Sequence, residues 1–242
     1  MRYYFAPMEG LTDSIYRREH HRFFGGVDRY YMPFFSPTVH RTFTSRETRE
    51  LPKADSVPFC AVPQVLTNDP ENFLWAAEAC RDLGYAEINL NAGCPSGTVV
   101  AKRKGSGMLR DLDSLASFFD RIFAKSPLPV SVKTRLGMEE PEEFEKILAL
   151  YNRYPFRELI VHPRVRRQFY EGQVQIEWFR YAAEHTAIPL CYNGDIRSLA
   201  DIRALEEAYP QLPAVMIGRG LIADPGMLAG GTEIDTLEAF LN

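Results

Sequence analysis

Short apolar runs alternate with longer segments of helical periodicity along almost the whole chain. Runs rich in β-branched and aromatic residues are typical of buried strands, whereas apolar residues at every third or fourth position are typical of helices that cover a sheet. The pattern predicts eight strands, at residues 3–8, 29–34, 59–65, 86–91, 130–134, 158–162, 190–193 and 214–218. It predicts six helices, at residues 13–23, 70–83, 112–124, 141–154, 176–185 and 199–208.

The order of these elements predicts a (β/α)8 TIM barrel. Eight strands at even spacing fit a closed barrel better than an open doubly wound sheet. Asn68 or Asp69 before Pro70, and Ser198 before Leu199, provide helix caps at the expected places. The segment 35–58 is rich in Arg, Thr and Pro, and we expect an irregular loop there rather than a helix. We expect the barrel at residues 1–228 and a C-terminal tail at residues 229–242.

The composition is that of an ordinary globular protein. Of 242 residues, 45% are hydrophobic and 25% are charged, and the formal net charge is −4. These values exclude disordered, collagenous and disulfide-stapled classes. No apolar run approaches the ~18 residues needed to span a bilayer, and Pro7 breaks the N-terminal run, which is too short for a signal peptide. We therefore expect a cytoplasmic monomer with no membrane partner.

The four cysteines differ in their surroundings. They lie far apart, without a C-x-x-C pair or a nearby His at ligand spacing, so we expect neither a metal site nor a disulfide framework. Cys60, Cys80 and Cys191 lie within apolar patterns and fit the role of small core residues. Cys94 instead follows a strand, between a glycine and a proline, which places its thiol on a loop over the barrel mouth and favours a chemical role over a packing role.

Polar residues end nearly every predicted strand. In TIM barrels the active site gathers at the carboxyl ends of the strands. Amides and charges buried there cost free energy unless something polar pairs with them, and a bound ligand is the simplest partner. The residues in question are Pro7, Met8, Glu9, Gln64, Asn89, Asn91, Lys133, Arg135, His162, Arg164, Asn193, Gly194, Asp195, Gly218 and Arg219.

Structural alternatives exist for some of these residues. Gln64 and Asn193 could equally be core amides that bond to the backbone, and a single histidine such as His162 is more often structural. Lys133, in the middle of a strand, favours a functional interpretation. Arg219 lies between two glycines after the last strand, which is the usual phosphate position of this fold.

Arginines are concentrated in two of the predicted loops. Their distribution predicts a basic rim around the barrel mouth despite the negative net charge, and such a rim suits a polyanion. The alternative is a scatter of ordinary solvated side chains. The rim would include the basic loop Lys102-Arg-Lys and the arginines Arg41, Arg46, Arg49, Arg164, Arg166 and Arg167.

Short motifs occur in a fixed order over residues 3 to about 226, and they are APMEG-x-TD, PQ, NLNAGCPS, KRKGSGML, VKTRLG, VHPR, YNGDI and MIGRG. In this order and spacing they resemble the tRNA-dihydrouridine synthase family of flavoenzymes. The resemblance implies FMN at the barrel mouth, NADPH or NADH as reductant, and reduction of the C5–C6 double bond of uridine in tRNA.

The resemblance also implies roles for individual residues. Cys94 matches the family's catalytic acid, and Lys102 matches a basic residue beside the substrate. Asn91 corresponds to a residue near both flavin and base, and arginines such as Arg135, Arg164 and Arg166 would bind the RNA. The implied flavin contacts are Pro7, Met8, Glu9, Gln64, Asn91, Lys133, His162, Asn193, Gly194, Asp195, Gly218 and Arg219.

General chemistry is consistent with the role of Cys94. Hydride delivery to C6 of a uracil puts negative charge on C5 and O4, and a thiol on the opposite face can protonate C5. A uracil within folded RNA must first be turned outward, at a cost of a few kcal/mol.

Two alternatives remain at the level of sequence. The first is an FMN barrel of the dihydroorotate dehydrogenase type that reduces a small molecule. It shares the fold and a related N-x-x-C-P loop and needs no basic rim. The second is a barrel that only binds flavin or RNA. Members of the tRNA-dihydrouridine synthase family usually continue into a helical tRNA-binding domain, of which residues 229–242 would be only the start.

Overall fold

The strands form one parallel sheet that curls into a nearly closed barrel, as predicted. The computed structural model describes residues 1–241, and within them the strand order is β3-β2-β1-β9-β8-β7-β6-β5-β4. All strand pairs are parallel. The strands are β1 (Arg2–Phe5), β2 (Arg29–Tyr31), β3 (Ala61–Val62), β4 (Gln64–Val65), β5 (Ile88–Ala92), β6 (Val130–Arg135), β7 (Leu159–His162), β8 (Leu190–Tyr192) and β9 (Ala214–Ile217).

The predicted strand at residues 59–65 is divided in two by Pro63. Its first part, β3, pairs with β2, and its second part, β4, pairs with β5. Proline has no backbone N–H and interrupts a ladder of hydrogen bonds. The carbonyl of Pro63 still accepts from the backbone N–H of Asn89 at 2.9 Å. The two short strands therefore occupy the one place in the barrel where a single strand was expected.

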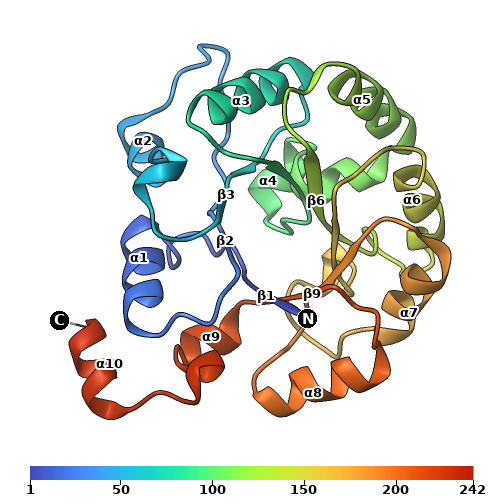
Figure 1. The fold of residues 1–242 in the computed structure, drawn as a ribbon. Coiled ribbons are helices and arrows are strands. Elements are labelled where there is room, and N and C mark those ends of the chain that lie inside the picture. The colour runs from blue at the N-terminus through green and yellow to red at the C-terminus, as the bar shows by residue number, and fades with distance from the viewer. Residues whose placement is uncertain (242) are drawn as a thin grey trace.

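All six predicted helices are present, and they cover the outside of the sheet (Figure 1). Asp69 accepts from the backbone N–H groups of Glu71 and Asn72, and Ser198 accepts from that of Asp201, so both predicted caps are confirmed. The helices are α1 (Ser14–Phe23), α3 (Pro70–Asp82), α5 (Leu112–Lys125), α6 (Glu143–Tyr151), α7 (Ile176–His185) and α8 (Leu199–Ala208).

The prediction of an irregular loop at residues 35–58 is wrong in part, because the segment contains the helix α2 (Ser45–Glu50). This helix has no buried residue and hence no apolar stripe to reveal it. Its start is fixed by a capping box, in which Thr44 and Glu47 bond to each other's backbone N–H groups. Three other short helices were also not predicted, namely α4 (Gly97–Ala101), α9 (Arg219–Ala223) and α10 (Ile234–Leu241).

The last helix, α10, lies against α1 on the outside of the barrel (Figure 1). The ring of Phe240 packs edge-on against Tyr16 and Phe24, with ring centroids 5.3 Å apart in both pairs. The predicted tail is therefore helical over most of its length. No helix formed by residues 1–241 is both long and apolar enough to cross a bilayer.

Aliphatic and aromatic side chains fill the layer between sheet and helices and share the barrel interior with buried polar side chains. Cys80 and Cys191 are fully buried there, as predicted. The prediction for Cys60 is wrong, because this residue is exposed. It comes directly before β3, where the chain enters the sheet from solvent. An apolar run thus does not reveal how well the residues at its start are covered.

Candidate active site

A cavity of about 430 Å³ lies at the carboxyl ends of the strands. This volume is within the usual range for small-molecule and cofactor sites. The cavity brings together most of the residues that the sequence singled out. The predicted residues that line it are Pro7, Met8, Glu9, Gln64, Asn91, Cys94, Lys133, Arg135, His162, Asn193, Gly194, Asp195, Gly218 and Arg219.

Four predicted residues do not line this cavity, and one of them, Asn89, is fully buried in the barrel interior. Lys102 is exposed beyond the end of α4, and its carbonyl accepts from the Asn68 amide at 3.2 Å. The Arg166 Nε donates to the Pro95 carbonyl at 3.3 Å, and its guanidinium lies 5.0 Å from the ring of Phe169. Arg164 is fully buried behind the cavity wall.

The loop that carries Cys94 is held from two sides. The Cys94 backbone N–H donates to Asn91 Oδ1 at 2.9 Å, and the Cys94 carbonyl accepts from the Ser106 hydroxyl at 2.8 Å. Gly105 lies directly against it at φ +57°, and a Cβ there would come within 2.9 Å of the Cys94 Cβ and carbonyl oxygen. Only glycine fits this contact without strain. The thiol is therefore placed at the cavity wall by a fixed backbone.

Two cations from β6 reach the cavity. Burial, and to a lesser degree the charge of the neighbouring Arg135, lowers the pKa of Lys133 to about 8. No described side chain or carbonyl forms a hydrogen bond or ion pair with the Lys133 ammonium. Arg135 is held by the carbonyls of Gly93 and Val165, at 2.8 and 3.2 Å, and burial lowers its pKa to about 10. The cavity therefore presents positive charge that lacks an anionic partner.

His162, at the end of β7, is neutral in this environment. Burial lowers its pKa well below the usual value, and the charges of Arg135, Lys133 and Arg164 lower it further. Arg164 Nη1 lies 3.3 Å from His162 Nε2. Because a guanidinium can only donate, Nε2 must accept, and the ring carries its proton on Nδ1.

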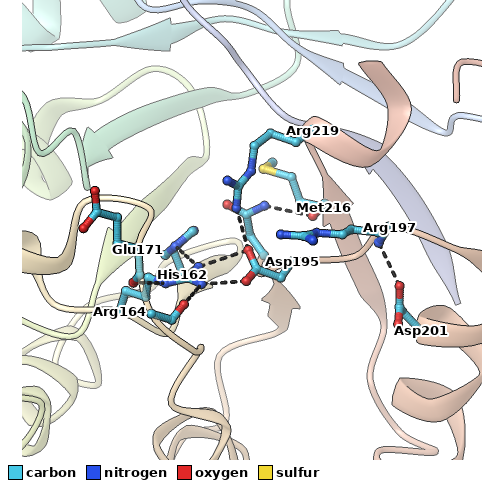
Figure 2. A network of polar contacts seen from close by, with 10 residues as sticks. His162, Arg164, Glu171, Asp195, Arg197, Asp201, Met216 and Arg219 are labelled. Carbon is cyan, nitrogen blue, oxygen red and sulfur yellow. Dashed lines mark hydrogen bonds and ion pairs between the residues drawn. The ribbon is translucent and has the colours of Figure 1, made fainter. Parts of the chain in front are cut away.

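Asp195 joins two arginines at one side of the cavity (Figure 2). Arg164 donates to both carboxylate oxygens, at 3.1 and 2.6 Å, and Arg219 donates to Oδ1 at 2.7 Å. Burial alone would raise the pKa of Asp195, but the hydrogen bonds and charges of the arginines lower it. Arg164 also donates to the carbonyls of Glu171 and Gly172, so it ties the loop after β7 to the loop after β8.

The sequence analysis did not single out Tyr170, which lines the cavity between two arginines. Its ring centroid lies 5.2 Å from the guanidinium carbon of Arg135 and 5.7 Å from that of Arg219. Tyr170 is 55% exposed, and Phe169 before it has φ +49°, which is uncommon for a non-glycine residue. The available signal was an aromatic pair, Phe169 and Tyr170, within the basic segment RRQFYEG.

The predicted basic rim is less uniform than the sequence suggested. Arg46 pairs with Glu9 at 2.7 Å, and Arg167 pairs with Glu140 at 3.1 Å. Arg164 is buried and paired. Residues 1–241 hold no cluster of three acidic, His or Cys side chains that could bind a metal ion. Three of the six rim arginines thus have acidic partners, and the cavity holds further positive charge on Lys133 and Arg135.

These features define a (β/α)8 barrel with a polar, cationic ligand cavity at the carboxyl ends of its strands. The sequence model described as dihydrouridine synthase matches residues 4–239. The chain belongs to the dihydrouridine synthase family of enzymes.

Individual relatives agree with this assignment. A probable tRNA-dihydrouridine synthase of Rickettsia bellii is 31% identical over 226 residues, which cover 93% of this chain and 68% of the relative. The tRNA-dihydrouridine synthase B of Proteus vulgaris is 30% identical, over 91% of this chain and 67% of that protein. The chain thus spans about two thirds of the length of these relatives.

Solved structures with low sequence identity share the fold. Morphinone reductase superimposes with a TM-score of 0.67 at 12% identity, over 97% of this chain and 88% of that one. The old yellow enzyme homologue of Zymomonas mobilis gives a TM-score of 0.63 at 11% identity, over 97% and 91% of the two chains. At this identity the likeness shows the barrel fold alone.

Proposed function

We propose that this protein reduces the C5–C6 double bond of uridine in tRNA to dihydrouridine, with FMN as cofactor and NADPH or NADH as reductant. The observation that carries the proposal is the convergence of Cys94 with the cations of β6 and with buried amides in one cavity. Membership in the dihydrouridine synthase family supports the reaction type.

The cavity fits an anionic, partly aromatic ligand such as FMN. Lys133 has no partner among the described residues and would offer its ammonium to such a ligand. At Gly218 the cavity wall is close to Ala6 and Met8, since a Cβ there would lie 3.4 Å from Ala6 Cβ and Met8 Sδ, in ordinary van der Waals contact. The guanidinium of Arg219 is exposed and can bond a phosphate while it stays paired with Asp195.

Following the family resemblance, we assign the flavin contacts to residues that line the cavity. Pro7, Met8 and Glu9 would lie along the ring system, with Gln64, Lys133 and Asn91 at its polar edge. His162 would donate from Nδ1. The ribityl chain and phosphate would lie along the segment Asn193, Gly194 and Asp195 and along Gly218 and Arg219.

Cys94 would act as the general acid. When bound and reduced, FMN supplies the hydride for C6 of the uracil. The Cys94 thiol gives its proton to C5, which leaves a thiolate that regains a proton from solvent, and such a positioned acid is worth ~10²–10⁴-fold in rate. Asn91 holds the backbone of this loop, so it positions the acid.

We propose that RNA is bound outside the cavity as well as within it. Arg135 and Tyr170 line the mouth, where a base turned out of its stack would enter. Lys102 and Arg166 lie outside the cavity and would contact the RNA backbone. Arg164 would act indirectly, because it fixes Asp195 and the loop after β7.

The remaining sequence expectations concern the chain as a whole. We propose that residues 1–228 form the FMN-binding catalytic barrel and that residues 229–242 begin a helical tRNA-binding region. The monomeric state, the absence of a metal and the cytoplasmic location stay predictions.

An absorption experiment tests the proposed function. The purified protein is saturated with FMN, reduced with NADPH under nitrogen, and then mixed with tRNA that lacks dihydrouridine. We expect the flavin bands to bleach with NADPH and to recover with tRNA, and dihydrouridine to appear in the RNA.

Each other outcome selects a different function. Bleaching without recovery on tRNA, but with recovery on a small unsaturated substrate such as orotate, would favour a dihydroorotate dehydrogenase type of activity. Failure to bind FMN, with RNA still bound, would favour a barrel that only binds nucleic acid.

A further inference from the structure

A continuous row of hydrogen bonds runs through the barrel interior from the Cys94 loop to the opposite end of the strands. It begins at the backbone N–H groups of Gly93 and Cys94 and ends at the carboxylate of Glu87. The links are Cys94 N to Asn91 Oδ1 (2.9 Å), Asn91 Nδ2 to Gln64 Oε1 (2.8 Å), Gln64 Nε2 to Asn89 Oδ1 (2.7 Å), Asn89 Nδ2 to Ser131 Oγ (2.9 Å) and Ser131 Oγ to Glu87 Oε1 (3.3 Å).

The sheet register explains why these side chains meet. Gln64 is the direct partner of Asn89 on β5, and Asn89 is the direct partner of Ser131 on β6. Side chains alternate along a strand, so Asn89 and Asn91 point to the same face of β5. Gln64, Asn89 and Ser131 are fully buried, and Asn91 nearly so.

The direction from donor to acceptor is fixed at both ends of the row. A carboxylate can only accept, so the Ser131 hydroxyl must donate to Glu87 and accept from Asn89. A backbone N–H can only donate, so Asn91 must turn its oxygen to the Cys94 loop. Each amide between these ends is consequently held in one of its two orientations. Reversing any one of them would place two donors or two acceptors face to face.

Glu87 is firmly anchored at the far end. It is 4% exposed, and its Oε2 accepts from Arg29 at 2.9 Å and pairs with Arg157 at 2.8 Å. The other oxygen is left for Ser131. In this way the charge at the base of the barrel and the backbone N–H groups of the Cys94 loop require the same orientation of two amides that line the cavity, Gln64 and Asn91.

We propose that Ser131 and Glu87 are positioning residues for the active site. They do not touch the cavity, but they fix which atoms Gln64 and Asn91 present to it, and through Asn91 they hold the Cys94 backbone. Ordering of the loop follows from the structure alone, whereas its effect on catalysis rests on the proposed function.

Ser131→Ala is the direct test, because it removes the hydroxyl that connects the amides to the carboxylate. Tyr151→Phe is the matched control, since it removes another fully buried hydroxyl that bonds only Thr134, at 2.9 Å, outside the row. Both are made in a Cys60→Ser background, so that Cys94 is the single accessible thiol beside the buried Cys80 and Cys191.

Two readouts on the full chain do not depend on activity. Hydrogen exchange, followed by mass spectrometry of peptides over residues 91–96, reports the Gly93 and Cys94 amides. The rate of alkylation by iodoacetamide reports access to the Cys94 thiol. In Ser131→Ala we expect exchange of these amides to accelerate about tenfold, which corresponds to about 1.4 kcal/mol, and alkylation to accelerate severalfold. Tyr151→Phe leaves both rates at the background value.

The proposal is overturned if Ser131→Ala and Tyr151→Phe behave alike in both readouts. If Ser131→Ala does not fold, Glu87→Gln gives the same test, because an amide at this position can donate and so removes the fixed donor-to-acceptor direction of the row.

Turnover is then measured with tRNA. A loss of kcat with unchanged KM in Ser131→Ala, and not in Tyr151→Phe, extends the proposal to catalysis, whereas unchanged kcat with accelerated exchange confines it to loop order. Absence of turnover in the Cys60→Ser parent contradicts the proposed function instead.

Discussion

The two ends of the barrel both bury polar and charged groups, but they pair them differently. At the amino end, Glu158 accepts from the hydroxyls of Tyr4 and Tyr31 at 2.9 and 3.1 Å, and Glu87 is bonded by Arg29. At the carboxyl end, the Lys133 ammonium has no partner among the described residues, although burial lowers its pKa to about 8.

This difference distinguishes groups that stabilise the fold from groups whose partner is supplied by a bound ligand. A buried polar group without a partner costs free energy, so a fold retains it at a site where binding supplies the partner. The amino end is closed to this use because its donors and acceptors already match. The comparison makes opposite predictions for substitutions at the two ends.

The largest effect is expected for Cys94→Ala at the carboxyl end. Without the acid, reduction of uridine in tRNA should fall by ~10²–10⁴-fold, while reduction of bound FMN by NADPH and the unfolding temperature stay close to those of the wild type. Single-turnover absorption measurements separate the two half-reactions. The exposed Cys60→Ser is the control and should keep full activity. Wild-type turnover in Cys94→Ala would remove the thiol from the mechanism.

The next largest effect is expected for Glu158→Leu at the amino end. This change leaves the buried hydroxyls of Tyr4 and Tyr31 without an acceptor, at about 1–3 kcal/mol for each. We expect the free energy of unfolding in urea to fall by about 2–5 kcal/mol, with the FMN affinity of the folded protein unchanged. Glu158→Gln, which keeps an acceptor, should lose less. A large loss of FMN affinity in protein that is still folded would contradict the separation of the two ends.

Lys133→Met at the carboxyl end should raise the free energy of unfolding, whereas Glu158→Leu at the amino end should lower it. In protein stripped of flavin it removes a desolvated charge, so we expect the free energy of unfolding at pH 7 to rise by about 1–3 kcal/mol. The folded-state pKa of Lys133, about 8, is below its ordinary value, so the unfolded chain binds more protons between pH 8 and pH 10.5. Wild-type stability should therefore gain a contribution as the pH rises through this window.

The substituted protein should lack that gain and should bind FMN more weakly. Urea titrations at pH 7 and pH 10, together with flavin fluorescence, measure both effects. A lower stability of Lys133→Met at pH 7 would mean that the ammonium already has a partner in the protein.

The barrel could be predicted from the sequence because its strands are buried on both faces and its long helices carry regular apolar stripes. The helix α2 could not, since SRETRE contains no apolar residue and its start depends on the bond between Thr44 and Glu47. The division at Pro63 was visible as a proline in a strand, but its consequence for pairing depends on both neighbouring strands.

The cavity residues could be predicted because they end strands, and parallel strands carry their ends to one place. The failures lie where a loop decides the direction of a side chain. Arg164 follows β7 directly, yet it turns inward to Asp195, whose loop is 31 residues further along the chain. Lys102 is eight residues after Cys94, but α4 lies between them and Lys102 stays in solvent. Such partners are set by tertiary contacts that no local pattern encodes.

The smallest predicted effect is a loss of protein stability at acid pH that comes from His20, a residue remote from both ends of the barrel. His20 of α1 is fully buried, with Nδ1 2.8 Å from the Tyr30 hydroxyl, and burial lowers its pKa to about 4. The unfolded chain binds the proton more tightly, so stability is lost as the pH falls from about 6.5 towards 4. Between pH 7 and pH 5.5 the loss should be about 1 kcal/mol.

Replacing the imidazole by an amide that can still bond Tyr30, as in His20→Asn, should remove this part of the pH dependence, whatever its effect on stability at pH 7. His162 at the cavity also has a lowered pKa, so its contribution should change when FMN is bound, whereas that of His20 should not. Urea unfolding of both proteins at pH 7 and pH 5.5, with and without FMN, measures the two contributions separately. If the pH dependence of wild type and His20→Asn coincides, His20 does not contribute to the acid sensitivity.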